Sequence, residues 1–381
     1  MSTKKVRLQD ICISISDGDH QAPPKSNSGV PFVTISNITN LNQIDFSDTM
    51  FVPRWYYEKI DSKRKAKAND ILYSVVGSFG IPVFIKNNKE FIFQRHIAIL
   101  RPNIKEIVPE YLYYVMLGRE FYMIADSVAV GAAQRTITLS SLRNIEIVIP
   151  EIVKQQRIIN IISIYDDLIE NNQKQIKLLE EAAQRLYKEW FIDLRFPGHE
   201  NVEIVDGIPV KWEYLEFLNI APIITGKKDA NFGSENGKYL FFTCSQQPLL
   251  AESYSYDCDA VILAGNGDFN VKLYRGKFEA YQRTYVLSPY KTEHLYLLFY
   301  TIKNRMNYLI QGASGSTIKF LTKGMIADIK VLVPTCEILN QYNEIAEPLQ
   351  RKLEVLIYQN KLLTEARDRL LPKLMSGEIE V

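Results

Sequence analysis

A heptad repeat across residues 158–190 constrains the fold of this chain more than any other stretch of its sequence. Apolar or aromatic side chains recur there at alternating steps of four and three residues, and Asn172 is the one polar member. This spacing lays a narrow apolar stripe along one side of an α-helix, where it packs against a partner helix. Neither Gly nor Pro interrupts the repeat, and its other positions favour helix. We therefore expect a long coiled-coil helix.

A second heptad seam near the C-terminus can supply the partner helix. Residues 178–182 (LLEEA) match residues 362–366 (LLTEA), 184 positions later. Adding this interval to the first seam gives a second one, again with a single Asn, Asn360. An antiparallel arrangement pairs Asn172 with Asn360, whereas a parallel one leaves both amides unpaired at about 1–3 kcal/mol each. We therefore predict that the two helices are antiparallel.

The same antiparallel register pairs apolar side chains: Ile162 with Leu370, Ile169 with Leu363, Ile176 with Leu356, and Leu179 with Leu353. Proline limits the second helix, because it lacks a backbone N–H and clashes with the preceding turn. We expect Pro348 to prevent a straight helix through Tyr342 and Ala346, and Pro372 to end the helix before Leu374. The layers between the two prolines span about 32 Å at roughly 1.5 Å per residue.

The residues that precede each seam repeat one order of motifs, which indicates an internal duplication. The pairs that show it best are 93–95 (FQR) with 281–283 (YQR), 76–79 with 264–269, and the glycine-containing loops 131–137 and 312–318. The first copy reads as mixed strands and helices, with a hairpin turn at 77–80 and a helix over about 109–125.

We predict an α+β fold, in which two mixed α/β domains are joined by an antiparallel two-helix coiled-coil rod. The domains would be residues 1–150 and 195–333, and the spacer helices residues 151–194 and 334–381. Two similar domains on such a rod are related by an approximate two-fold axis. Duplex DNA is a suitable target, because it presents the same groove on one face about every 34 Å. Since the loops of the two copies differ, their half-sites should differ too.

Composition narrows the class of protein. With 45 basic and 44 acidic residues the net charge is +1, so any basic surface must be local. The four cysteines and four histidines lack metal-ligand spacing, and we expect no metal site. The N-terminus has no signal-peptide pattern and no run of 18 apolar residues exists, so a soluble cytoplasmic protein is expected. A P-loop is absent, and the only Pro-Pro, at 23–24, lacks the context of an amino-methyltransferase motif.

Two segments carry a family resemblance. Residues 178–191 with 195–199 (RFPGH), and residues 367–377 (RDRLLPKLMSG), are similar to the central and C-terminal spacers of the specificity subunit of type I restriction–modification enzymes. The resemblance covers essentially the whole chain. It implies two target recognition domains that read a split sequence in double-stranded DNA, on a subunit without catalytic residues.

The resemblance also implies partners and their cofactors. Two modification subunits would bind the rod and methylate adenine with S-adenosylmethionine, and restriction/translocase subunits using ATP and Mg would join them. No cofactor is expected in this chain. Two alternatives stay open: a coiled-coil scaffold that reads no DNA, and a self-contained DNA methyltransferase or nuclease, against which the missing motifs argue.

Three classes of loop residue are candidates for DNA contact, because polar side chains on loops can reach base edges and phosphates. The first class is Asp19, His20, Gln21 and Lys25, with Lys227, Lys228 and Ser234 in the second copy. The second class is Gln94 and Arg95, with Gln282 and Arg283. The third class is Gln134, Arg135 and Thr136, with Ser314, Ser316, Thr317 and Lys319. A solvated loop or a fold-stabilising pair is the competing interpretation for each class.

Other residues are expected to stabilise the fold, to face solvent or to contact partner subunits. The basic run 63–65 reads as a solvated helix face, and Trp55, Tyr56 and Tyr57 as core. Partner subunits would contact the outer faces of the rod, and also a cluster of aromatic side chains too apolar for an idle surface: Tyr187, Trp190 and Phe191. Packing of these three against the second domain is the alternative.

Overall fold

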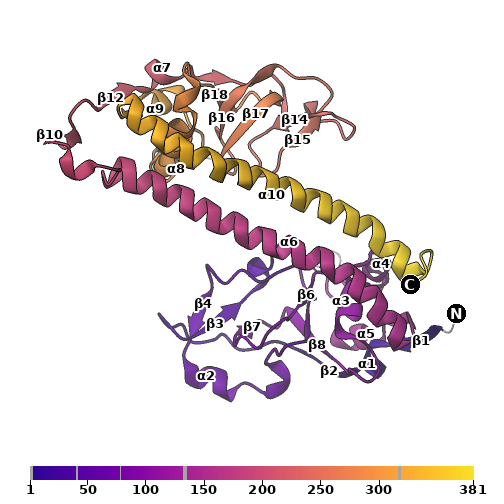
Figure 1. The fold of residues 1–381 in the computed structure, drawn as a ribbon. Coiled ribbons are helices and arrows are strands. Elements are labelled where there is room, and N and C mark those ends of the chain that lie inside the picture. The colour runs from indigo at the N-terminus through magenta and orange to yellow at the C-terminus, as the bar shows by residue number, and fades with distance from the viewer. Residues whose placement is uncertain (1–2, 40–41, 78, 132–134, 316–318) are drawn as a thin grey trace. The chain divides into compact units, whose positions relative to one another are not determined.

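The computed structural model describes residues 3–39, 42–77, 79–131, 135–315 and 319–381 (Figure 1). The chain divides into two compact units. Unit 1 comprises Met1–Glu170 and Lys361–Val381, and unit 2 comprises 171–360. Each unit therefore contains a strand-rich domain and a part of both long helices, α6 (Ile152–Tyr187) and α10 (Cys336–Ser376). Among the described residues, no helix is long and apolar enough to cross a membrane.

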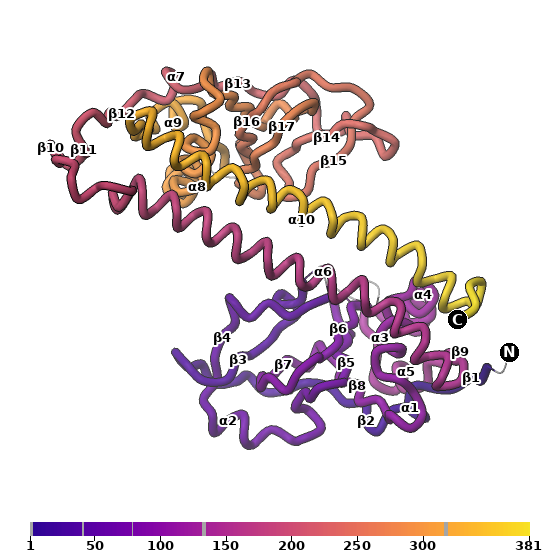
Figure 2. Tube along the Cα trace, in the orientation of Figure 1, coloured from indigo at the N-terminus to yellow at the C-terminus, as the bar shows by residue number. Residues whose placement is uncertain are grey.

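The two long helices run antiparallel, as predicted (Figure 2). In unit 2 the ring centroids of Trp190 and Tyr342 lie 5.8 Å apart, a pair that continues the predicted register. In unit 1 Arg367 Nη1 donates to Asp166 Oδ1 at 2.6 Å. The seam positions are buried or half-buried throughout, and none is exposed: Ile162, Ile169, Asn172, Ile176, Leu179, Leu353, Leu356, Asn360, Leu363 and Leu370.

The expectation that Pro372 ends the second helix before Leu374 is wrong, and Pro348 does not interrupt the helix either, while a bend at Pro348 stays a prediction. Helix α10 continues through Pro348 and Pro372 without interruption. A proline inside a helix costs about 3 kcal/mol, but the side chains around it are packed into the cores of the two units. Tyr342 and Ala346 are fully buried and Leu374 is 1% exposed. Burial of side chains of this size can offset the cost of each proline.

Unit 1 builds its domain from two sheets and short helices. The order β2-β8-β5-β6 forms one sheet and β4-β3-β7 another, while β1 pairs with β9. The strands are β1 (Thr3–Arg7), β2 (Cys12–Asp17), β3 (Val30–Val33), β4 (Met50–Val52), β5 (Ile71–Ser74), β6 (Pro82–Phe84), β7 (Ile92–Phe93), β8 (Ile97–Pro102) and β9 (Glu146–Pro150). The helices are α1 (Leu8–Ile11), α2 (Arg54–Lys59), α3 (Pro109–Leu117), α4 (Arg119–Ser127) and α5 (Leu139–Asn144).

Unit 2 repeats this plan with one continuous sheet in the order β13-β18-β16-β17-β14-β15, and β12 pairs with β19. The strands are β10 (Ile204–Val205), β11 (Ile208–Pro209), β12 (Glu213–Glu216), β13 (Ile224–Thr225), β14 (Tyr239–Phe242), β15 (Leu249–Ala251), β16 (Tyr256–Ala264), β17 (Val271–Ala280), β18 (Thr284–Leu287) and β19 (Lys330–Val333). The helices are α7 (Phe217–Ile220), α8 (Leu295–Gly312) and α9 (Lys323–Ala327).

The structure tests several local predictions made for the first domain. The hairpin around 77–80 is confirmed, because β5 and β6 pair antiparallel on either side of it. The single helix expected over 109–125 is wrong: Gly118 adopts an extended conformation, with ψ of 144°, and separates α3 from α4. Trp55 is not core, since half of its surface is exposed, whereas Tyr56 and Tyr57 are buried.

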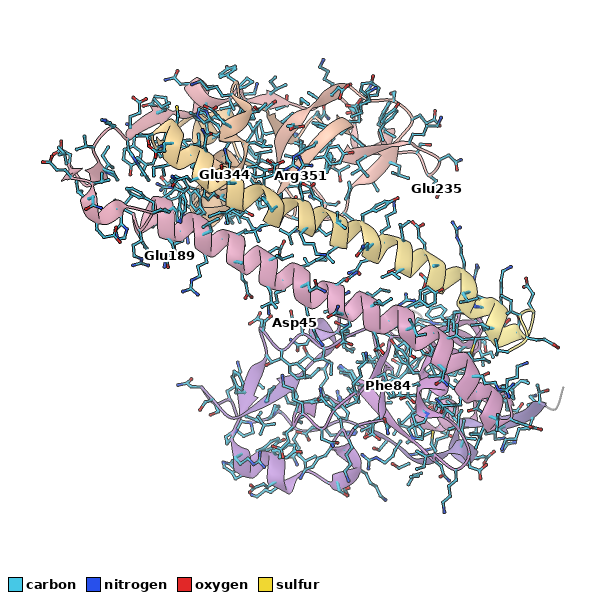
Figure 3. The ribbon with its side chains drawn as sticks, viewed as in Figure 1. Asp45, Phe84, Glu189, Glu235, Glu344 and Arg351 are labelled. Carbon is cyan, nitrogen blue, oxygen red and sulfur yellow. The ribbon has the colours of Figure 1, made fainter. Side chains whose placement is uncertain are left out.

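The aromatic cluster at the end of α6 belongs to the core of unit 2. Tyr187, Trp190 and Phe191 are each less than a tenth exposed. The ring of Phe191 lies 4.8 Å from Tyr342 and 5.8 Å from Trp212, centroid to centroid. The expectation that these three residues contact a partner subunit is therefore corrected: they pack against the second domain, which was the alternative. Glu189, labelled in Figure 3, ion-pairs there with Arg195 at 2.6 Å.

Candidate nucleic-acid interface

In unit 1, the three predicted loop classes meet at one edge of the four-stranded sheet. Strands β2 and β5 both end where β8 begins, since Asp17 pairs with Ala98 and Ser74 pairs with Ile97. The loops that follow β2 and β5 and the turn that precedes β8 therefore leave the sheet together. We call residues 18–21, 75–77, 94–96 and 135–137 the first loop edge.

Backbone hydrogen bonds tie these loops to one another. Arg95 N donates to Asp19 O at 2.9 Å, and Val75 N donates to His96 O at 2.9 Å. Ile137 N in turn donates to Val75 O at 2.9 Å, which brings the third loop class against the second. Four segments that are far apart in sequence thus present their side chains from one place.

Unit 2 repeats this network with different residues. Gln282 N donates to Lys228 O at 2.9 Å, and Gly265 N donates to Arg283 O at 2.9 Å. Leu321 N then donates to Gly265 O at 2.7 Å. We call residues 226–228, 265–267, 281–283 and 319–321 the second loop edge.

The matching bonds fix which residues correspond, and they correct the alignment made from sequence. Arg95 occupies the place of Gln282, and His96 the place of Arg283. The Gln-Arg dipeptides are therefore shifted by one position and do not occupy equivalent sites. Similarly, Ile137 bonds to Val75 and Leu321 bonds to Gly265, so Ile137 and Leu321 are equivalent residues. The sequence alignment had matched Ile137 to the residue three positions before Leu321.

One glycine in each edge is required by close backbone contact. A Cβ on Gly18 would lie 2.2 Å from Phe93 O, and a Cβ on Gly226 would lie 2.2 Å from Tyr281 O. No side chain fits at such distances, so both chains must turn there with glycine. These two glycines hold the first loop class against the second in each unit.

The first loop edge carries a mixed set of side chains. His20 is exposed, and its Nε2 lies 2.6 Å from Asp17 Oδ2. Arg135 pairs with Asp126 Oδ1 at 2.7 Å, so its charge is balanced within the unit. The remaining candidates are exposed or half-buried: Gln21, Lys25, Gln94, Arg95 and Thr136. Asp19 is buried, and it accepts a hydrogen bond from Tyr56 while burial raises the pKa of Tyr56 to about 12.

The second loop edge is more cationic. Lys227, Arg283 and Lys319 are exposed, and Lys228 Nζ lies 4.4 Å above the ring of Phe232. Gln282 donates to Asp229 at 2.9 Å. Ser234 donates to Glu252 at 3.2 Å, and Ser314 pairs through its backbone with Phe320. The candidates Gln134, Ser316 and Thr317 lie outside the described residues.

Some residues at these edges were not identified from sequence. Arg64 Nη2 lies 3.3 Å from Asp17 Oδ1, so one member of the basic run 63–65 reaches the first loop edge instead of facing solvent alone. Lys272 and Asn270, on and beside β17, contact the loop after β14 in unit 2. The basic run was visible as a charge pattern, but no sequence signal marks Lys272.

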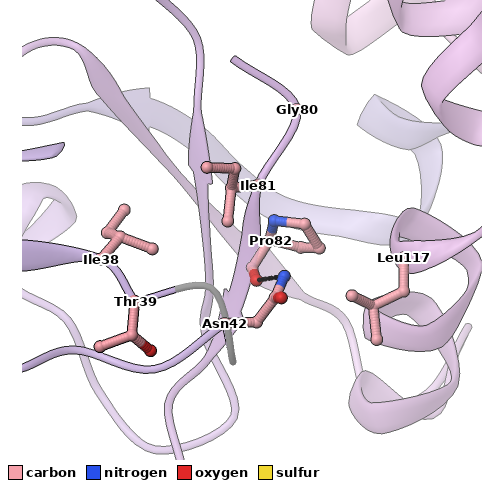
Figure 4. A pocket seen from close by; sticks show the side chains of 7 residues that line it. All are labelled: Ile38, Thr39, Asn42, Gly80, Ile81, Pro82 and Leu117. Atoms are coloured by element: carbon pink, nitrogen blue, oxygen red, sulfur yellow. Dashed lines mark hydrogen bonds between the residues drawn. The ribbon is translucent and has the colours of Figure 1, made fainter. Parts of the chain in front are cut away.

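No group of three or more His, Cys, Asp or Glu in the described ranges could hold a metal ion. A cavity of about 310 Å³ in unit 1 is lined by residues without ionisable side chains (Figure 4): Ile38, Thr39, Asn42, Gly80, Ile81, Pro82 and Leu117. Asn42 closes part of its wall by donating to Pro82 O at 2.8 Å.

Comparison with known proteins assigns the family. The sequence matches the Type I restriction modification DNA specificity domain over residues 2–181 and again over 209–364. The EcoDI specificity subunit of Escherichia coli is 39% identical over 170 residues, which are 44% of this chain and 36% of that protein. The putative MjaX specificity subunit of Methanocaldococcus jannaschii is 26% identical over 403 residues, covering 98% of this chain and 93% of that one.

A solved structure shares the fold. The type I restriction–modification S subunit from M. genitalium covers 98% of this chain and 96% of its own, with a TM-score of 0.66 and 18% identity. The chain belongs to the family of type I restriction–modification specificity subunits, which recognise DNA and carry no catalytic activity. The family resemblance, the α+β class and the internal repeat expected from sequence are thereby confirmed.

Proposed function

We propose that this specificity subunit binds a bipartite, asymmetric target in double-stranded DNA and that each loop edge reads one half-site. The observation that carries the proposal is that the three predicted loop classes meet at one edge in unit 1 and again in unit 2. The two edges differ in chemistry, since the exposed residues Arg95 and Gln282 occupy equivalent places in them. Different side chains in equivalent places would read different bases.

We further propose the division of labour in the complete complex. Residues 1–150 and 195–333 would be the recognition domains, and 151–194 and 334–381 the spacers to which two modification subunits dock. Exposed apolar side chains on the long helices, Leu178 at 64% and Tyr358 at 60%, support docking there. Restriction/translocase subunits would complete the cytoplasmic complex, and S-adenosylmethionine, ATP and Mg would bind to the partners.

Methylome sequencing of a host that expresses the chain with its modification subunits tests the proposal. We expect one split motif with two unlike halves. A continuous motif, or methyl transfer by the purified chain alone, would overturn it. DNA binding by the assembled complex should also fall steeply with salt, because phosphate contacts release counterions. The absence of salt-dependent DNA affinity in the assembled complex would favour the scaffold alternative, a coiled coil that never touches DNA.

Matched arginine variants assign the half-sites. Arg95→Gln should relax the motif at positions in one half only, and Arg283→Gln in the other half only. Arg119→Gln, at an exposed position on α4, is the control and should leave the motif unchanged. If Arg95→Gln and Arg283→Gln relaxed the same half, the assignment of one edge to each half-site would be wrong.

A further inference from the structure

A loop that the sequence did not single out lies against the second loop edge. Residues 243–248 connect β14 to β15, and Phe242 O at their start accepts a hydrogen bond from Tyr281 N at 2.9 Å. Cys244 Sγ lies 3.6 Å from Arg283 O. This loop therefore leaves the sheet beside the turn 281–283, where DNA contact is proposed.

Two side chains from the β16–β17 hairpin hold this loop by its backbone. Lys272 Nζ donates to Ser245 O at 2.9 Å, and Asn270 Nδ2 donates to Cys244 O at 3.0 Å. Lys272 also donates to Asn270 Oδ1, which joins the two anchors. Successive carbonyls of the loop are thus fixed, and backbone held at two adjacent points has little freedom to rotate.

The fold itself does not require a lysine at this position. Val75 and Gly265 are equivalent, so Leu72 corresponds to Ile262, and their partners across each hairpin are Val83 and Lys272. Val83 is 2% exposed and belongs to the core of unit 1. Burial lowers the pKa of Lys272 to about 8, although the nearby Cys244 and Asp268 oppose the shift. A charge is therefore kept, at some cost, where the first repeat has a packed valine.

The corresponding loop of unit 1 has a different character. There Asn37, in the 3-10 helix η1 (Ile35–Asn37), accepts a hydrogen bond from Thr34 N at 2.9 Å and so turns its amide back on its own loop. In unit 2, the Gln246 side chain donates to Asp268 O at 3.3 Å. Gln247 is exposed, and its side chain makes no hydrogen bond to the part of the chain that the structure describes.

We propose that residues 245–247 read bases of the second half-site, with Gln246 and Gln247 as specificity-determining residues and Lys272 and Asn270 as the residues that position them. The inference rests on the proposed function, in which the second loop edge reads DNA. A glutamine amide can accept from adenine N6 and donate to adenine N7 in the major groove. The second half-site should therefore contain an adenine, on one strand or the other, that is read by this loop.

The glutamines are tested in the complex reconstituted with its modification subunits. Methylation rates are compared between the cognate duplex and duplexes with one base pair changed in either half-site. Gln247→Ala or Gln246→Ala should reduce discrimination at an A·T position of the second half-site by about ten-fold or more. Discrimination at the first half-site should remain as in the wild-type complex.

The positioning residues are tested by the same comparison of methylation rates between the cognate duplex and duplexes with one base pair changed. Lys272→Met and Asn270→Ala should relax the second half-site alone, and Lys272→Arg, which keeps the donors, should restore much of the discrimination. A general loss of folding would instead lower methylation of all duplexes together. Lys330→Met, at an exposed position on β19, is the matched control and should change neither half-site.

The outcomes separate the two proposals. Unchanged discrimination in both glutamine variants, with a wild-type complex that still methylates a split motif, would overturn the inference and leave the proposed function standing. A wild-type complex without sequence preference would overturn both. If Lys272→Met fails to fold, the exposed Gln247 decides the question, because its side chain makes no hydrogen bond to the described residues that the replacement could remove.

Discussion

Lys86 Nζ lies 2.5 Å from Glu170 Oε2 on α6, and the same ion pair recurs in unit 2, where Arg275 Nη1 lies 3.1 Å from Glu354 Oε2 on α10. The correspondence follows from two registers. Lys86 and Arg275 each stand three residues beyond the equivalent pair Val83 and Lys272, and Glu354 stands 184 residues after Glu170. In both repeats a cation beside the hairpin therefore holds the recognition domain to a long helix.

The two copies of this ion pair should differ in strength. The Arg275 side chain is 18% exposed and also donates to Tyr296, whereas the Lys86 side chain is 50% exposed. Glu354→Gln should lower the free energy of unfolding by about 1–2 kcal/mol, and Glu170→Gln by less than about 1 kcal/mol, as for exposed pairs. Urea unfolding of the full chain measures both.

Glu344→Gln on the exposed face of α10 (Figure 3) is the control for these variants and should have almost no effect. A loss for Glu170→Gln that equals or exceeds the loss for Glu354→Gln would contradict the ranking by exposure of the two cations, Lys86 and Arg275.

A buried ion pair distinguishes the first repeat from the second. Arg101 donates to both oxygens of Asp70, at 2.9 and 2.8 Å, and Asp70 is 2% exposed. The equivalent positions in unit 2 are Ala260 and Ser288. Asp70→Ala strands a partly buried guanidinium and should cost about 3–5 kcal/mol.

The double variant Asp70→Ala/Arg101→Ser copies the second repeat and should recover more than half of that loss, because it removes the stranded charge. Thermal unfolding of the single and double variants checks this coupling. Additive losses would show that the two side chains act independently.

The long helices could be predicted because their signal is repeated over many turns. A seam such as that from Ile162 to Ala183 leaves few alternatives, since each heptad supports the same face. Asn172 and Asn360 then favoured one direction. Pro372 misled, because the penalty for proline is a local quantity, whereas burial of Leu374 depends on a domain that folds around it.

The loop edges were only partly predictable. Gly18 and Gly226 mark equivalent turns, but the letters Gln-Arg recur one position out of register in the two copies, so matching sequence letters paired Arg95 with Arg283 instead of with Gln282. Lys272 carries no sequence signal, since its partners on the loop after β14 are backbone carbonyls. Trp190 shows another limit, because an apolar side chain at a helix end looks the same whether it meets its own domain or a partner.

The predicted pairing of Asn172 with Asn360 makes a separate prediction about register. Asn172 is 7% exposed, and Asn360 is half-buried in the opposite seam. Asn172→Leu alone should destabilise the helix pair by about 1–3 kcal/mol, because the amide of Asn360 then faces an apolar side chain. The double change to Leu should recover much of the loss. A double-mutant cycle by thermal unfolding measures the coupling, and its absence would argue against this pairing.

Lys272 predicts a pH dependence of stability. Its pKa is lowered to about 8 in the folded chain, first by burial, against an ordinary value of 10.5. Below about pH 8 both states hold the proton, and the folded state bears the full cost of the buried charge. Between the two pKa values only the unfolded chain holds it, so stability rises with pH. Compared with Lys272→Met, the wild-type chain should therefore gain stability from pH 7 to pH 9.5. Lys330→Met should track the wild type across this range. A Lys272→Met difference that stays flat, or that moves the other way, would contradict the lowered pKa of Lys272 in the folded chain.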